Sequence, residues 1–202
     1  NGCEIDGDQI MAVCAEYLTA QGKLQSEGFV ATVMSNLGLH KFCEAQHLKL
    51  LCAAVGDRNV LELMQKEGMV LGGEQSGHII FLDHMTTGDG QLAALQFLSI
   101  LGRSGKKASE LAGQITHYPQ VLKNVKVGSN EEKTAVLNSA ELAQTVAREE
   151  EKLSGRGRIL LRASGTEPLI RVMAEADTQD LAESVVKTLV EAVENVQKIL
   201  KK

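Results

Sequence analysis

The sequence has little cysteine and no long apolar segment, and each scarcity excludes a class of protein. The four cysteines, Cys3, Cys14, Cys43 and Cys52, all lie in the first quarter of the chain, with no C-x-x-C pair and no zinc-type histidine spacing. This pattern excludes a disulfide scaffold and predicts reduced thiols in a cytoplasmic protein. No segment reaches the roughly 20 apolar residues needed to cross a bilayer, and no basic-then-apolar signal opens the chain. We therefore expect no membrane partner.

Positive charge is also in short supply. The sequence has 21 Lys and Arg against 26 Asp and Glu, for a net charge of −5. This balance argues against a general nucleic-acid binder, although it is compatible with a local basic pocket. The chain begins Asn-Gly-Cys rather than with methionine. We expect it to be a piece of a longer polypeptide.

The first half of the chain alternates helical and strand patterns, which predicts an α/β domain over residues 1–112. Asp6 or Asp8 can cap a first helix that runs to about Thr19. A helix after Asp89 is apolar nearly all round, so we expect it to be buried. Alternation of this kind favours a mixed sheet between helices, in three layers. The other expected elements are strands near 28–34, 48–55 and on both sides of 72–78, and helices near 35–46 and 56–68.

The pattern changes near Pro119, one of only two prolines, and a second domain is expected over 121–202. Residues 113–120 would form the hinge between the two domains. The order strand, helix, strand, strand, helix predicts a small α+β domain (β-α-β-β-α) with its helices on one face of a sheet. The middle helix starts with a capping-box pattern from Asn138 to Glu141. The last helix should begin near Asp177 or Thr178 and bury Leu181, Val185, Leu189, Val193 and Leu200.

Residues 162–171, the arginine-flanked loop, form the turn between two apolar strands. Gly165 permits backbone angles at which successive N–H groups converge on an anion, and Ser164 and Thr166 add hydroxyl donors. Arg162 and Arg171 could present planar pairs of donors to phosphate oxygens. A plain hairpin turn would use the same small residues. Because a turn needs no arginine, the two flanking arginines favour a phosphate site.

Residues 72–78, the carboxylate-histidine loop, combine groups suited to a sugar. Glu74 can accept from two neighbouring hydroxyls, Ser76 can donate and accept, and glycines such as Gly77 allow close backbone approach. His78 could move a proton near neutral pH. The alternative is an ordinary turn whose histidine is hydrogen-bonded within the protein. If this loop is considered without the rest of the sequence, the alternative is favoured.

Two further polar stretches have simpler interpretations. In "VGDR", residues 55–58, Asp57 can cap the following helix and Arg58 can be a surface cation. Asp6 and Asp8 are spaced as in some divalent-metal loops, but a cap and a first-turn acid explain them better, so we predict no metal site.

Taken together, the two loops carry a resemblance to a known family. "GGEQSGHIIFLDHMTTGDG" followed by "RASGTEPLIRVMAEA" resembles the α-D-phosphohexomutase superfamily, as do "NGCEIDGDQIMAV", "VATVMSNLGL" and "VGDR.VLE". Within the superfamily, the sequence of the first loop is most similar to that of the bacterial members that act on glucosamine phosphates. The resemblance covers the third and fourth family domains and the end of the second. It therefore implies a C-terminal fragment.

The resemblance implies an isomerase that interconverts glucosamine 6-phosphate and glucosamine 1-phosphate, on the cytoplasmic route to UDP-N-acetylglucosamine and the cell wall. In the family a phosphoserine in the first domain passes its phosphoryl group to the sugar through a bisphosphate intermediate, and a loop in the second domain binds Mg²⁺. Neither motif occurs in this sequence, so the fragment alone should be inactive. The missing N-terminal domains are then the expected partner, and a homodimer of the full-length phosphoprotein is left open.

The resemblance also implies roles for individual residues. Arg162, Ser164, Gly165, Thr166 and Arg171 would bind phosphate, and Glu74, Ser76 and Gly77 would bind the sugar. His78 would assist proton transfer, and Arg58 would add positive potential near the phosphate. Two alternatives stay open: a family member acting on mannose or glucose phosphates, and a stand-alone sugar-phosphate binding module without a nucleophile.

Overall fold

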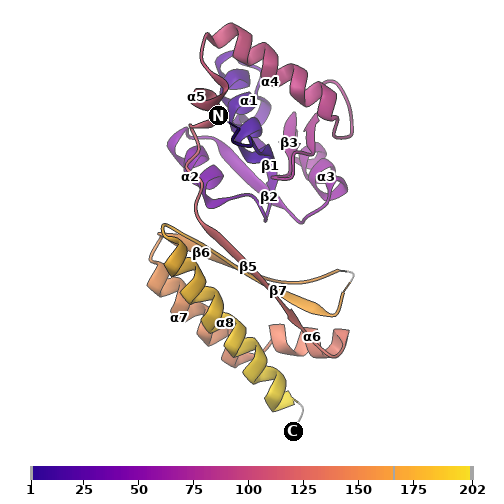
Figure 1. The fold of residues 1–202 in the computed structure, drawn as a ribbon. Helices are drawn as coiled ribbons and strands as arrows, with labels where there is room; N and C mark the ends of the chain where they lie inside the picture. Colours follow the sequence, from indigo (N-terminus) through magenta and orange to yellow (C-terminus); the bar gives the residue numbers. More distant parts are fainter. Residues whose placement is uncertain (1, 166, 201–202) are drawn as a thin grey trace. The chain divides into compact units, whose positions relative to one another are not determined.

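A computed structural model describes residues 2–165 and 167–200, and the chain divides into two compact units (Figure 1). The first unit comprises Asn1–His117 and the second Tyr118–Lys202. The break lies inside the 113–120 segment in which the sequence places a hinge.

The first unit is built on a four-stranded mixed sheet in the order β2-β1-β3-β4. Strand β1 (Gly28–Thr32) is parallel to β2 (Lys49–Ala53) and to β3 (Leu71–Gly73), whereas β4 (Ile79–Phe81) returns antiparallel to β3. The expected mixed sheet is confirmed. The helical elements of this unit are α1 (Gly7–Ala20), η1 (Gln25–Glu27), α2 (Leu37–Ala45), α3 (Asp57–Glu67), α4 (Gly90–Ser104) and α5 (Ala108–Ala112).

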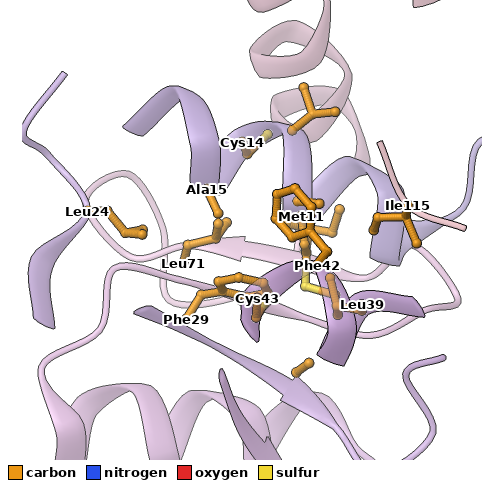
Figure 2. Close-up of a cluster of buried hydrophobic side chains, with 14 of the residues drawn as sticks. Met11, Cys14, Ala15, Leu24, Phe29, Leu39, Phe42, Cys43, Leu71 and Ile115 are labelled. Atoms are coloured by element: carbon orange, nitrogen blue, oxygen red, sulfur yellow. The ribbon is translucent and has the colours of Figure 1, made fainter. Parts of the chain in front are cut away.

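Both faces of this sheet are covered, which gives the three layers that the sequence predicts. Successive side chains of a strand point to opposite faces. Phe29 accordingly joins the cluster that includes α1 and α2, whereas Val30 packs with Val60 and Met64 of α3. Figure 2 shows the larger cluster, with Met11, Cys14, Phe29 and other buried side chains gathered between helices and sheet. The carboxyl ends of β1, β2 and β3 are therefore held on a rigid base.

Two of the cysteines lie in this core. Burial raises the pKa of the Cys14 thiol and of the Cys43 thiol to about 12. Both thiols therefore stay protonated at neutral pH and act as small apolar groups. None of the four cysteines, all of which lie among the described residues, is in a disulfide.

Helix α4 departs from the prediction that it is buried all round. Only Ala93 and Ile100 are fully buried, and the side chains of Leu95 and Leu98 are 66% and 57% exposed. The helix packs on α1 along one face, and apolar composition alone does not reveal how many faces have a neighbour.

The second unit is a three-stranded antiparallel sheet with β7 (Leu169–Ala176) between β5 (Gln120–Lys126) and β6 (Gly157–Ala163). Its helices are α6 (Asn130–Leu137), α7 (Ala140–Leu153) and α8 (Gln179–Leu200). Alternate residues of β7 pack against α8 in a single core, which includes Ile170, Val172, Val185, Leu189 and Val193.

Two details of the second unit differ from the sequence-based expectation. The order expected from the sequence contained no helix at the position of α6. In addition, Asn138 is the C-cap residue of α6, whereas the sequence pattern placed it at the start of the next helix. The Asn138 N–H donates to Thr134 O at 3.1 Å, and Ser139 is the N-cap residue of α7. On the predicted apolar face of α8, Val185, Leu189 and Val193 are buried, Leu181 in the first turn is only partly buried, and Leu200 in the last turn is half exposed. In the described part of the chain, no helix combines the length and apolarity needed to cross a bilayer.

Candidate functional site

Three polar loops meet at one edge of the first unit's sheet. Strands β1, β2 and β3 are parallel, so their carboxyl ends lie at the same edge. The segments that follow them contain Asn36, Gly56 to Arg58, and Glu74 to His78. Ligands of α/β proteins commonly bind at this edge of the sheet. The fold thus brings the carboxylate-histidine loop beside the "VGDR" segment, which sequence spacing alone could not show.

The carboxylate-histidine loop is a tight turn between β3 and β4. Its backbone is closed by two hydrogen bonds: the Glu74 N–H donates to His78 O, and the Gly77 N–H donates to Glu74 O, both at 3.0 Å. Gly77 has φ +96, a conformation that other residues rarely adopt. Ser76 is exposed at the tip of the turn. The loop therefore presents polar groups from a fixed backbone.

The "VGDR" segment fixes the Glu74 carboxylate. Glu74 Oε1 accepts from the Gly56 N–H at 3.0 Å, and Gly56 has φ +122, which favours glycine at this position. Within residues 2–165 and 167–200 this is the one hydrogen bond of the Glu74 side chain, so Oε2 is left for a hydroxyl donor. The backbone of the "VGDR" segment therefore holds the Glu74 side chain in place.

His78 lies against the same segment. Its Nε2 is 3.7 Å from Asp57 Oδ2, a contact that becomes an ion pair when the imidazole is protonated. A Cβ atom on Gly88 would lie 2.4 Å from the His78 ring, so glycine at 88 leaves room for it. Asp57 is not the helix cap that the sequence allowed, because Gly56 is the N-cap residue of α3. Asp57 lies beside the histidine without a hydrogen bond, and His78 Nε2 is buried with no hydrogen-bond partner among the described residues.

Arg58 is directed away from this cluster. Its side chain is 87% exposed, and its Nε donates to Glu62 Oε1 at 2.8 Å, one turn further along α3. Of the residues predicted to bind substrate in the first unit, Arg58 is therefore the one whose side chain contacts its own helix and not the carboxylate-histidine loop.

The carboxylate-histidine loop rests on the N-terminus of α1, a contact that the sequence analysis did not predict. The Gly7 N–H donates to Gln75 O at 2.9 Å. A Cβ atom on Gly7 would lie only 2.1 Å from Glu74 O and 2.8 Å from Gly77 N. Asp6 caps α1 as predicted, in a capping box with Gln9. In the sequence, the one feature that could have indicated this close approach was Gly7, a glycine at the first position of the expected helix.

Asp8 is a buried carboxyl next to the segment that follows β1. Its Oδ2 accepts from the Asn36 N–H at 2.7 Å, which ties α1 to the segment after β1. Burial raises the pKa of Asp8 to about 6, against the opposing effect of hydrogen bonds from Asn36 and Ser35. Among the residues with described coordinates, no three His, Cys, Asp or Glu side chains cluster as a metal site.

The raised pKa of Asp8 predicts a pH-dependent stability. Since the pKa rises from 3.8 to about 6 on folding, the stabilisation is fully present below pH 3.8 and is lost as pH rises through about 6. The size is about 2–3 kcal/mol at 1.36 kcal/mol per pKa unit. In urea denaturation at pH 4.5, 5.5 and 7, Asp8→Asn should show a flatter pH dependence than the unsubstituted chain. Parallel curves for the two proteins would contradict this.

In the second unit, the two predicted arginines face each other across a strand pair. Arg162 of β6 and Arg171 of β7 are directly opposed in the register. Their Nε atoms are buried and, within the described residues, neither has a hydrogen-bond partner. Burial, and then the charge of Arg171, lower the pKa of Arg162. Like charges directly opposite each other destabilise a sheet. An anion bound between the two guanidinium groups would reduce this repulsion.

The turn between these arginines is tied down by its own side chains and backbone. Ser164 is 2% exposed, and its Oγ accepts from the Glu167 N–H at 3.3 Å. The Pro168 carbonyl accepts from the Val127 N–H at 2.9 Å, which joins the end of the turn to the end of β5. Thr166 lies outside the described residues.

Gly165 does not have a left-handed backbone, although the prediction relied on the conformational freedom of glycine at this position. Its φ lies outside the positive range, and in the described part of the chain nothing lies within 4 Å of where its Cβ would be. Its backbone is therefore open to an approaching ligand.

Lys133 is a contact of this turn that sequence reasoning missed. The side chain comes from α6 and is 8% exposed. Its Nζ donates to Ser164 O at 2.7 Å and to Glu167 O at 3.4 Å. Because α6 was absent from the expected order, no pattern pointed to this lysine.

Comparison with known proteins identifies relatives along the whole chain. Residues 6–118 match the model of phosphoglucomutase/phosphomannomutase alpha/beta/alpha domain III, and residues 122–192 match that of the phosphoglucomutase/phosphomannomutase C-terminal domain. The chain is 56% identical over 190 residues to phosphoglucosamine mutase of Anoxybacillus flavithermus, covering 94% of this chain and 42% of that protein. It is 48% identical over 194 residues to the same enzyme of Ligilactobacillus salivarius, covering 96% and 42%. The chain thus spans about two fifths of the length of these relatives.

Solved structures share the fold at lower identity. N-acetylphosphoglucosamine mutase of Aspergillus fumigatus, in complex with GlcNAc-6P and magnesium, superposes with a TM-score of 0.77 at 20% identity, over 96% of this chain and 44% of that one. An N-acetylglucosamine-phosphate mutase in its product complex gives a TM-score of 0.75 at 22% identity, over 93% and 43%.

Proposed function

The chain belongs to the phosphoglucomutase/phosphomannomutase family, and we propose that it forms the sugar- and phosphate-binding part of a phosphoglucosamine mutase. The longer protein would interconvert glucosamine 6-phosphate and glucosamine 1-phosphate through a phosphoserine and a bisphosphate intermediate. The identities of 56% and 48% to phosphoglucosamine mutases support this choice within the family.

The observation that carries the proposal is the opposed pair Arg162 and Arg171. Two guanidinium groups with buried, unpaired Nε atoms face each other in the described sheet. A phosphate with two negative charges would neutralise both and accept their N–H donors in pairs. Ser164, Gly165 and Thr166 would complete the phosphate site, with Gly165 leaving its backbone open.

The carboxylate-histidine loop is proposed to bind the sugar. Glu74, fixed by Gly56, would accept from hydroxyls, while Ser76 and the Gly77 backbone contribute further polar contacts. His78, which lies beside Asp57, would carry a proton to or from a sugar oxygen. Arg58 would leave Glu62 and pair with the substrate's phosphate. Its ion pair with Glu62 is exposed to solvent, and such pairs contribute little energy, so breaking it costs little.

Magnesium does not fit the described residues of this chain, because no cluster of acidic or histidine side chains is present there. We propose that the metal loop and the phosphoserine belong to other domains of a longer polypeptide, which acts in the cytoplasm and forms precursors of the cell wall. Residues 113–120 would act as a hinge that allows the second unit to release the intermediate. A homodimer of that polypeptide is compatible with the proposal.

The proposal is tested by titrating the 202-residue chain with inorganic phosphate, glucosamine 6-phosphate and mannose 6-phosphate, followed by amide NMR shifts. All three compounds should shift residues 162–171, and only the sugar phosphates should shift residues 74–78. A preference for mannose 6-phosphate would move the assignment to a mannose-specific family member. An absence of shifts at 162–171 with every compound would overturn the phosphate site.

Glu74→Gln separates sugar recognition from phosphate recognition. Glutamine keeps an acceptor for the Gly56 N–H but loses the charge. Affinity for glucosamine 6-phosphate should fall by about tenfold, since a hydrogen bond to a charged group contributes about 1.5–3 kcal/mol. Affinity for inorganic phosphate should not change. Glu44→Gln, which removes an exposed carboxylate paired only with Lys41, is the matched control. An equal loss for both ligands would contradict the sugar role.

A further inference from the structure

Lys133 is a buried cation whose charge has no carboxylate beside it. Across the described ranges its ammonium makes no ion pair within 4.0 Å, and its contacts are the carbonyls of Ser164 and Glu167. Burying a charge without a counter-charge is costly, and carbonyl dipoles offset only part of that cost. Even the half-exposed Lys152 pairs with an acid, the buried Glu149.

The two carbonyls that Lys133 binds belong to the turn between Arg162 and Arg171. In a trans peptide the C=O and the following N–H point in opposite directions. Because the Ser164 carbonyl is held toward Lys133, the Gly165 N–H is turned away from it. No described atom lies within 4 Å of the Gly165 Cβ position, so no described side chain packs on the glycine there. Lys133 thereby turns a backbone donor to the side of the turn opposite its own ammonium.

The helix that carries Lys133 is itself fixed. Ser129 caps α6 by accepting from the Glu132 N–H at 3.2 Å, and Gln197 of α8 donates to Glu132 Oε1 at 3.1 Å. Gln197 also donates to Lys126 O at 3.0 Å. The helix that carries the ammonium is therefore anchored to β5 and α8 of the same unit.

We propose that Lys133 is a positioning residue for phosphate recognition: it holds the Ser164 and Glu167 carbonyls so that the Gly165 N–H faces the anion. Lys133 acts from the carbonyl side of the turn and does not itself contact the anion. This inference rests on the proposed function, since it assumes that phosphate binds this turn.

Lys133→Met tests the inference, because methionine fills the same space without charge or donors. Binding of inorganic phosphate should weaken by about tenfold, the scale for a misplaced charge-assisted donor. In the ligand-free protein the Gly165 amide resonance should shift, and Lys133→Gln, which keeps one donor, should restore part of the affinity. Lys152→Met is the control: it removes a lysine that pairs with the buried Glu149 and, within the described residues, makes no hydrogen bond or ion pair to the turn.

The outcomes are distinguishable. Wild-type affinity in Lys133→Met, or a loss no larger than that of Lys152→Met, would overturn the positioning role while leaving the proposed function intact. If Lys133→Met does not fold, Lys133→Gln decides by the same comparison: a weaker folded variant supports the role and an unchanged one refutes it. Absence of phosphate binding by the unsubstituted chain would instead refute the proposed function.

Discussion

Replacing Arg162 with glutamine should remove most of the phosphate affinity and leave the protein at least as stable as before. The guanidinium is expected to donate to the anion, and a charge-assisted hydrogen bond contributes about 1.5–3 kcal/mol, or roughly 10- to 100-fold in affinity. Because phosphate is common to all substrates of the site, inorganic phosphate and glucosamine 6-phosphate should lose affinity together.

The sign of the stability change follows from the register. Arg162 is opposite Arg171, burial and the charge of Arg171 lower the pKa of Arg162, and its buried Nε lacks a partner among the described residues. Removing one of two opposed like charges should raise the free energy of unfolding by about 0.2–1 kcal/mol. Stabilisation combined with loss of binding is typical of a functional residue and is not expected of a structural one.

Arg158 provides the control on the same strand. Its guanidinium binds the fully buried Glu175 through two nitrogens, with Nε 2.6 Å from Oε2. Arg158→Gln would leave that carboxylate buried and short of its cation, at a cost of about 3–5 kcal/mol in stability. Its phosphate affinity, measured by calorimetry on the folded protein, should be unaffected. If Arg162→Gln instead behaves like Arg158→Gln, the arginine is structural and the phosphate site is wrong.

Sequence patterns were most informative where one residue type has one physical use. The opposed arginines could be singled out because a turn has no need for them, and the alternation of helix and strand was enough to predict a mixed sheet in three layers. Caps at Asp6 and Asp89 were also predictable, since a short acceptor before a helix has a local role.

The contacts that sequence patterns missed are between segments far apart in the chain. Glu74 meets Gly56, and Lys133 meets Ser164, through sheet topology and a helix that no pattern indicated. The exposed Leu95 shows the same limit for burial, because periodicity describes a helix but not the number of its neighbours. The loops at the carboxyl edge of the sheet are brought together by tertiary structure. The residues that they contact could therefore not be predicted from the spacing of residues along the sequence.

The contact between α1 and the carboxylate-histidine loop leads to the second large effect, expected for Gly7→Ala. A Cβ at this position would lie 2.1 Å from Glu74 O, 2.8 Å from Gly77 N and 2.9 Å from Gln75 O, all backbone atoms that cannot rotate away. Either α1 or the loop must move, which should cost about 1–3 kcal/mol as an overpacked site. The loop is the more easily displaced of the two, because α1 is packed into the core.

Displacing the loop should affect sugar binding specifically. The Glu74 carboxylate and His78 would lose their alignment with Gly56 and Asp57. Affinity for glucosamine 6-phosphate should fall by about tenfold or more, since hydrogen bonds to charged groups are lost. Inorganic phosphate, which is expected to bind the second unit, should keep its affinity.

Gly90→Ala is the matched control for Gly7→Ala, because both glycines are the first residue of a helix. In the described structure nothing lies within 4 Å of the Gly90 Cβ position, so alanine fits there and should stabilise slightly through helix propensity. Calorimetry with both ligands and urea denaturation of both variants give the comparison. If Gly7→Ala binds glucosamine 6-phosphate as tightly as Gly90→Ala does, the loop at 74–78 does not need its support from α1. If both ligands are lost together, the change acts through folding rather than through the sugar site.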